Sequence, residues 1–112
     1  MPLYLCGYFF MEVRRMVHSF EGKAPRVEAA AFIAWNADII GEVSLGQDAT
    51  IWAGASLRGD IAPIVVGPET NIQEGAILHV ATDVPCVLGR GVTVGHGAIV
   101  HAATVEDYSL IG

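Results

Sequence analysis

Large aliphatic residues recur with a step of six along most of the chain, in runs that begin at residues 27, 66 and 88. A helix places apolar residues three and four apart, and a half-buried strand places them two apart. A sustained step of six instead indicates a coil of short parallel strands, with one strand and one corner in each hexad. The aliphatic positions are Val27, Ile33, Ile39, Leu45, Ile51, Leu57, Val66, Ile72, Leu78, Leu88, Val94, Val100, Val105 and Ile111.

A small or β-branched residue follows most of these aliphatics four positions later, where a tight corner is expected. These residues are Ala31, Ala37, Val43, Ala49, Ala55, Ile61, Thr70, Ala76, Thr82, Val92, Ala98, Thr104 and Ser109. Three hexads make one triangular turn of about eighteen residues. The predicted fold class is therefore all-β, a parallel β-helix. A β-sandwich with short strands and glycine turns is the alternative, and it does not account for so many corner residues in register.

The repeat assigns residues 21–112 to one β-helix domain and leaves residues 1–20 outside it as an N-terminal extension. Within the extension, Leu3 to Phe10 is apolar but too short to span a membrane, and His18 is assigned no chemistry. The chain stops at Gly112, where a new hexad opens. Because solenoids need a capping element, we expect the domain to be truncated at its C-terminus and to lack a C-terminal capping helix.

Three of the four histidines lie between residues 79 and 101, and the hexads predict how they are placed. His79 follows Leu78 and His101 follows Val100, three hexads later. The two histidines should therefore stack on one face in adjacent turns, about 4.8 Å apart at the backbone. Arg58 follows Leu57 and belongs to the same column.

His96 is the third residue of the hexad that begins at Val94, so it lies on the neighbouring face and points outward. It cannot easily reach His79 and His101 around its own chain. If the three histidines bind one ion, His96 must come from a second subunit. The alternative for each histidine taken alone is an ordinary surface or packed imidazole.

Three segments together resemble the gamma-class carbonic anhydrase family. They are ASLRGD (residues 55–60), GPETNIQEGAILHV (residues 67–80) and VTVGHGAIVHAATV (residues 92–105). The resemblance covers about residues 20–112. It implies a left-handed β-helix that forms a homotrimer, with a zinc or iron ion at each subunit interface. It also implies that His79 and His101 of one chain and His96 of the next hold the ion.

The resemblance assigns roles to three further residues. Arg58 and Asp60 correspond to a salt-bridging pair near the site, and Gln73 to a residue that hydrogen-bonds metal-bound water. The hexads place Gln73 on the face of His96, one turn below it. The alternatives are a structural salt bridge at the interface for Arg58 and Asp60, and a ladder residue of the sheet for Gln73.

The implied function is hydration of carbon dioxide to bicarbonate by a metal-bound hydroxide, the reaction of a carbonic anhydrase-like hydro-lyase. Three imidazoles leave an open position on Zn²⁺, and Fe²⁺ or Co²⁺ suits the same ligands. One alternative is a metal-binding family member with little or no hydration activity. Another is a hexapeptide-repeat acyltransferase, in which a histidine acts as general base.

The sequence departs from the best-characterised active family members at two places. Those members carry a Glu shortly after the RGD segment, where this chain has Ile61-Ala62-Pro63. They also carry an acidic loop after the first histidine. Here that loop is residues 81–85, and Asp83 is its only acid. Efficient proton transfer is therefore in question, which keeps the metal-binding alternative open.

Composition and charge narrow the classes of binding partner and the cellular compartment to be expected. The net charge of −6 and the lack of a basic run argue against nucleic acid as a partner. Cys6 and Cys86, the latter in an excursion loop, match no metal-binding spacing and indicate a reducing, cytoplasmic compartment. Trp35 and Trp52 are predicted to point outward, which favours contact with a partner chain. We expect a small-molecule substrate and no membrane association.

Overall fold

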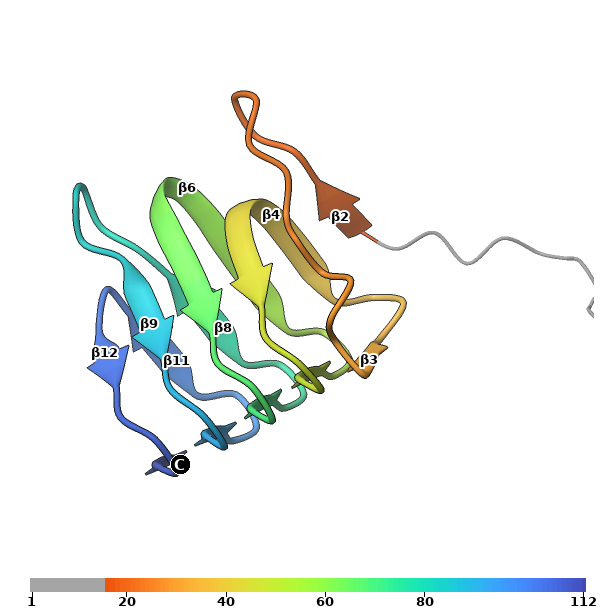
Figure 1. Ribbon diagram of the computed structural model, residues 1–112, viewed down its shortest axis with the longest axis vertical. Helices are drawn as coiled ribbons and strands as arrows, with labels where there is room; N and C mark the ends of the chain where they lie inside the picture. Colours follow the sequence, from red (N-terminus) through yellow and green to blue (C-terminus); the bar gives the residue numbers. More distant parts are fainter. Residues whose placement is uncertain (1–15) are drawn as a thin grey trace, which may run out of the picture.

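The computed structural model describes residues 16–112, which form short strands joined by turns (Figure 1). The strands are β2 (Met16–His18), β3 (Phe32–Ile33), β4 (Asp38–Leu45), β5 (Thr50–Ile51), β6 (Ser56–Val66), β7 (Asn71–Ile72), β8 (Ile77–His79), β9 (Cys86–Leu88), β10 (Thr93–Val94), β11 (Ile99–His101), β12 (Thr104–Val105) and β13 (Leu110–Ile111). Residues 16–112 contain no helix, so this part of the chain is all-β, as the six-residue step predicts.

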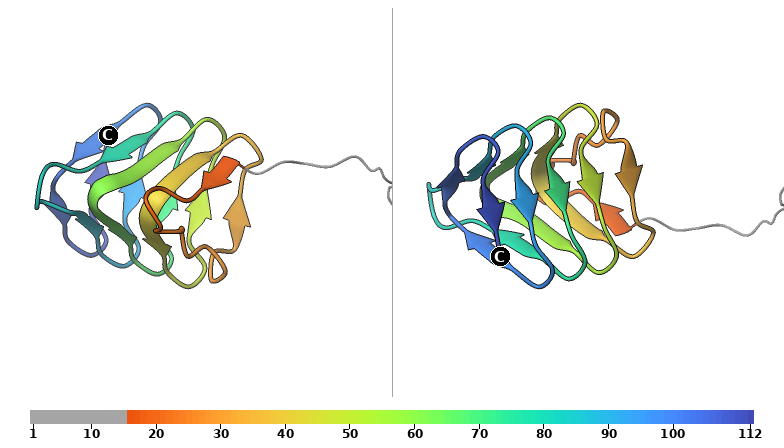
Figure 2. Two further views of the ribbon diagram at one scale, coloured as in Figure 1. Left: turned by 90° about the horizontal axis from the view of Figure 1, so that it is seen from above. Right: turned by 90° about the horizontal axis from the view of Figure 1, so that it is seen from below.

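Strands of successive turns pair in parallel and stack into the faces of a prism. One face has the strand order β13-β10-β7-β5-β3, and a second has the order β11-β8-β6-β4-β2. Strands β4 and β6 are long because each continues around a corner into the third face, where the end of β6 pairs with β9 and β9 pairs with β12. Both views in Figure 2 show the turns side by side in chain order. The predicted left-handed β-helix is confirmed.

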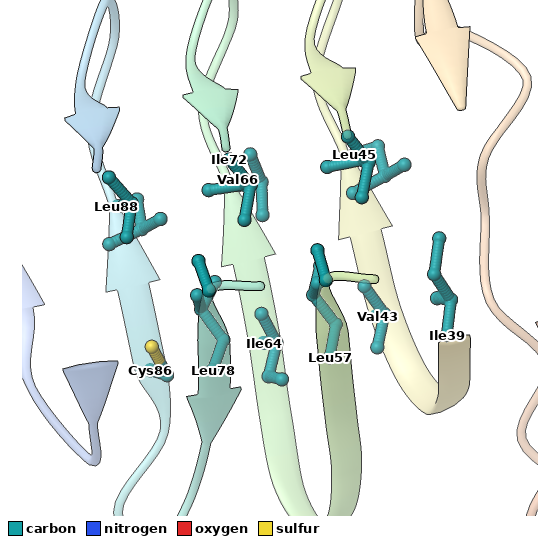
Figure 3. Packing of buried hydrophobic residues seen from close by; sticks show 14 of the residues in the cluster. Ile39, Val43, Leu45, Leu57, Ile64, Val66, Ile72, Leu78, Cys86 and Leu88 are labelled. Carbon is teal, nitrogen blue, oxygen red and sulfur yellow. The ribbon is translucent and has the colours of Figure 1, made fainter. Parts of the chain in front are cut away.

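The periodic aliphatic residues fill the interior of the coil. Those without exposed surface include Ile39, Ile51, Leu57, Ile72, Leu78 and Val94. Figure 3 shows buried side chains in rows that run from turn to turn, with Leu45, Val66 and Leu88 in one row. Each aliphatic side chain removed from water contributes roughly 1.5–3 kcal/mol. The hexad pattern is therefore the pattern of the core.

The predicted corner residues are wrong where the chain passes from the second face to the third, at Ile61, Thr82 and Thr104; Thr104 is exposed and pairs with Val87, the residue after Cys86. Ile64, not Ile61, pairs with Val43, and Cys86, not Thr82, pairs with Ile64. The side chains of Val43, Ile64 and Cys86 form one buried row (Figure 3), whereas Ile61 is 53% exposed and Thr82 is exposed. Extra residues in these two turns bulge outward before the chain returns to the core. Cys86 therefore belongs to the buried strand β9 and not to a loop.

Strand β2 extends the second face beyond the first complete turn. Met16–His18 pairs in parallel with β4, and His18 lies opposite Ile40. These residues fall in the segment that the sequence leaves outside the repeat; the domain boundary at residue 20 stays a prediction. Residues 1–15, which include Cys6 and the apolar run, lie outside the described residues. From residue 16 to residue 112, no helix is long and apolar enough to cross a bilayer.

Candidate functional site

The predicted column of Arg58, His79 and His101 is present on the second face. Arg58 of β6 pairs with His79 of β8, and His79 pairs with His101 of β11. Each residue directly follows a buried leucine or valine, so strand alternation turns its side chain away from the core. The register derived from the hexads is therefore confirmed. The metal-binding role of the two histidines stays a prediction.

The two imidazoles stack on each other. Their ring centroids are 5.2 Å apart, and the ring planes differ by 17°. The Nε2 atom of His79 lies 3.2 Å from Asp60 Oδ1, and the Nε2 atom of His101 lies 3.1 Å from the carbonyl oxygen of Val80. Each ring donates in these contacts when it carries its proton on Nε2. The column thus presents two nitrogen ligands from adjacent turns.

Asp60 joins Arg58 to His79. Arg58 Nη1 donates to Asp60 Oδ2 at 2.6 Å, and the N–H of Ile61 donates to Asp60 Oδ1 at 2.8 Å. Burial raises the pKa of Asp60, but the hydrogen bonds from Ile61, His79 and its own backbone, with the Arg58 charge, outweigh burial and lower the pKa below 3.8. Asp60 is therefore an ionised acceptor beside His79 at neutral pH.

A second group of side chains lies on the face formed by β3, β5, β7, β10 and β13. A shallow pocket of about 460 Å³ is lined by Thr50, Trp52, Asn71, Gln73, Glu74 and His96. Gln73 and His96, the two predicted site residues of this face, therefore line the same pocket. Asn71, which also lines the pocket, donates through Nδ2 to Thr93 Oγ1 at 3.1 Å.

Glu74 lies beside the predicted site residue His96, although the hexads were not used to predict it. Its Oε1 atom lies 2.9 Å from His96 Nδ1. A carboxylate on one ring nitrogen orients the imidazole and leaves the other nitrogen for a ligand. The hexads contained the signal. Glu74 is the third residue of the hexad that begins at Ile72, and His96 is the third residue of the hexad that begins at Val94. The same position in adjacent turns means that the two side chains stack.

The predicted metal ligands do not converge within one chain. Among residues 16–112, no three His, Cys, Asp or Glu side chains are arranged to hold a metal ion. His79 and His101 lie together on the second face, while His96 lies in the pocket beside Gln73. The predicted ligands therefore lie on two different surfaces of the chain, which we call the predicted half-sites, and they could meet at one ion only between two chains.

The two segments that depart from the family pattern lie at the corner next to His79. Ile61 belongs to the bulge of β6, and its side chain is exposed. Asp83 lies in a tight turn in which Ala81 and Val84 bond to each other, and its φ of 58° is in the left-handed region. Asp tolerates that conformation better than most residues, so the turn itself accounts for this acid.

Comparison with known proteins relates the chain to one family. No family model matches it. The gamma carbonic anhydrase 3 of Arabidopsis thaliana, described as mitochondrial, is 44% identical over 105 residues, which cover 88% of this chain and 40% of the relative. A carbonic anhydrase of Geobacillus kaustophilus (strain HTA426) is 43% identical over 72 residues, covering 64% of this chain and 40% of the relative. The chain thus spans about 40% of the length of these curated relatives.

A solved structure supports the same fold. The crystal structure of a hexapeptide transferase family protein from Anaplasma phagocytophilum matches with a TM-score of 0.75 and 44% identity, over 80% of this chain and 52% of that one. The names of these relatives include both carbonic anhydrases and a transferase. The similarity therefore fixes the fold and the family more firmly than the reaction.

Proposed function

Because the chain belongs to the gamma-class carbonic anhydrase family of hexapeptide-repeat proteins, we propose that it hydrates carbon dioxide to bicarbonate at a metal ion shared between subunits of a homotrimer. His79 and His101 of one subunit and His96 of the next are the proposed ligands. The observation that carries the proposal is the stacked pair of imidazoles in adjacent turns, with the third imidazole held on a separate surface.

The donor set fits a metal ion of this kind. Imidazole nitrogens suit Zn²⁺, Fe²⁺ and Co²⁺, and three of them leave a position open for substrate. Zn²⁺ is our first choice. When bound, such an ion lowers the pKa of water to about 7 and so supplies a nucleophile at neutral pH. The chain has to supply the ligands, orient them and hold the substrate beside them.

The side chains around the histidines have distinct proposed roles. Glu74, 2.9 Å from His96 Nδ1, fixes the orientation and tautomer of that ring. Asp60, held by Arg58, does the same for the His79 ring from the other half-site. The Gln73 amide accepts or donates a hydrogen bond that orients the attacking water. Gln73 therefore contacts the reacting atoms, while Arg58 and Asp60 act through His79.

Exposed apolar side chains beside the half-sites support the homotrimer. Ile77 and Ile99 are 42% and 64% exposed on the second face and flank the histidine column. Phe32 and Leu110 are exposed on the face that carries Gln73. Apolar surface on both half-sites is what an interface that joins them requires.

A metal-binding trimer with little hydration activity is the second candidate. It is favoured by the bulge of β6, which places the apolar residue Ile61 where active relatives are expected to carry a Glu. Hydration then lacks an efficient path for the proton that must leave the site. A cytoplasmic location remains part of the proposal, on the evidence of the cysteines alone.

The test is metal content measured beside hydration. The protein is purified without oxygen, its metal is measured per chain by plasma mass spectrometry, and hydration is followed by stopped flow with a pH indicator. The matched control is His79→Ala/His101→Ala, which removes two outward side chains and leaves the core intact. We expect bound metal and hydration in the wild type and neither in the control. Metal without hydration would favour the second candidate; acyl transfer from coenzyme A without metal would favour an acyltransferase.

A further inference from the structure

Trp52 lies in the His96 pocket, yet neither the half-sites nor the core accounts for it. Trp52 is the residue after Ile51 at the end of β5, in the same hexad position as Gln73 after Ile72. The backbone N–H of Trp52 donates to the carbonyl of Ile72, and that of Gln73 donates to Val94. Trp52 and Gln73 are therefore neighbours in one column, about 4.8 Å apart at the backbone.

The indole of Trp52 is fixed on two sides. Its Nε1–H donates to Thr50 Oγ1 at 3.1 Å, and its ring packs against Phe32 with centroids 4.7 Å apart. The only polar group of the indole is thus engaged by a neighbour on its own strand. Since 38% of the residue remains exposed and it lines the pocket with Gln73 and His96, the surface that it offers there is apolar.

The geometry points to Trp52 as the wall that holds carbon dioxide beside Gln73 in the proposed hydration reaction, on which this inference rests. Carbon dioxide is uncharged, carries no hydrogen-bond donor and gains by leaving water for an apolar surface. The negative face of an aromatic ring also attracts its electropositive carbon atom. Bicarbonate is charged and strongly hydrated, so the same wall gives it no comparable gain. Trp52 would therefore select the substrate over the product.

This role predicts an asymmetric kinetic effect. A wall that binds carbon dioxide equally in the ground state and the transition state lowers the KM for hydration and leaves kcat nearly unchanged. The equilibrium constant of the reaction fixes the ratio of kcat/KM in the two directions. Loss of the wall must therefore appear as a raised KM for carbon dioxide in hydration, and as a lowered kcat with an unchanged KM in dehydration of bicarbonate.

The experiment compares Trp52→Ala and Trp52→Phe with Trp35→Ala in the full metal-loaded protein. Trp35 is the matched control, because it is the other tryptophan of the chain, is 64% exposed and is not among the residues that line the pocket. Kinetics are measured in both directions at saturating buffer, so that proton transfer does not limit the rate. Metal content and trimer mass are measured for each variant. Bicarbonate is also titrated into the Co²⁺-loaded proteins while their visible absorption is followed.

We expect Trp52→Ala to raise the KM for carbon dioxide about five- to tenfold, the loss expected for so small an apolar contact. Trp52→Phe should recover most of that loss, since it restores an aromatic face. Metal content, trimer mass and the bicarbonate midpoint of the Co²⁺ spectrum should match the wild type. Unchanged kinetics in Trp52→Ala would overturn the inference, and so would loss of metal or of the trimer, which would make Trp52 an interface residue. A wild type that binds metal and does not hydrate carbon dioxide would overturn the proposed function, and this inference with it.

Discussion

Two corners of the prism position the two half-sites in different ways. At the corner that carries His96, the corner segments of adjacent turns are equally long, and the N–H groups of Gly75 and Gly97 donate to the carbonyl groups of Ala53 and Glu74 one turn below. At the corner next to His79, Gly41 and Val43 of β4 pair with Gly59 and Ile64 of β6, so β6 bulges between its two paired parts. The corner near His96 is therefore the same in successive turns, whereas the corner near His79 contains extra residues in β6.

The difference shows two ways in which a solenoid orients a histidine. At the regular corner, Glu74 reaches His96 because stacked turns bring equal positions together. At the bulged corner, Asp60 is the first residue of the insertion, and its carboxylate turns back toward His79 and Arg58. A regular turn provides a partner by repetition, whereas a bulge provides one that the repeat cannot.

The largest expected effect is on metal binding, and it tests whether the two corners meet across a subunit boundary. His96→Ala chains and His79→Ala/His101→Ala chains should each bind metal poorly, since every interface lacks a ligand. Mixed cyclic trimers of either composition bring one intact His79–His101 pair to one intact His96, so each should regain one metal site. The two kinds of chain carry different tags, so that mixed trimers can be isolated and their metal measured per trimer. If well-mixed trimers contain no metal, the shared site is wrong.

A smaller effect, on stability, tests the bulge. Ile64→Ala should lower the free energy of unfolding by about 2–5 kcal/mol, because Ile64 is fully buried and its loss leaves a cavity. Ile61→Ala should change it by less than about 0.5 kcal/mol, because Ile61 is exposed. Urea denaturation of both variants measures the difference. Equal losses, or a larger loss for Ile61→Ala, would restore the register with Ile61 at the corner.

Removal of Glu74 tests the regular corner. Glu74→Ala should weaken metal binding by about 10- to 100-fold, the usual cost of losing the carboxylate behind a histidine ligand. The core should be unaffected, since the side chain is half exposed. Competition with a chelator measures the metal affinity, and Glu69→Ala is the control at another exposed corner. An affinity equal to that of the wild type would show that the contact with His96 does not orient a ligand.

The smallest effect concerns the buried row that closes the bulged corner. Burial raises the pKa of the Cys86 thiol above 9.0, although a hydrogen bond with Ala103 opposes this. Since the folded pKa exceeds the unfolded one, the contribution of the neutral thiol to stability is complete below pH 9 and is lost as the pH rises through the folded pKa. Wild type should therefore lose more stability than Cys86→Ala between pH 7 and pH 10.

The comparison uses urea unfolding at the two pH values, with Cys6→Ser in both backgrounds so that only residue 86 differs. The cavity left by Cys86→Ala does not depend on pH and cancels in the difference. The same pH dependence in both proteins would mean that the Cys86 thiol ionises as readily in the folded state as in the unfolded chain.

Much of the candidate site was predictable by counting. His79 and His101 are three hexads apart, and the structure pairs them in adjacent turns. Gln73 and His96 were expected on one face, and both line the same pocket. Glu74 could have been found by the same count. The contacts of Asp60 with His79 and of Trp52 with Thr50 could not, since they depend on side-chain directions that the repeat does not specify.

The sequence by itself determined the parallel coil, its buried aliphatic rows and the column of Arg58, His79 and His101. The physical reason is that a solenoid is held together by contacts between equal positions of neighbouring turns, so that a regular step is enough to assign faces. Only the tertiary structure decided that Ile64 and Cys86, and not Ile61 and Thr82, return to the core. Where residues are inserted, the six-residue step no longer predicts which residue is buried. Only pairing with the adjacent strand then sets the register.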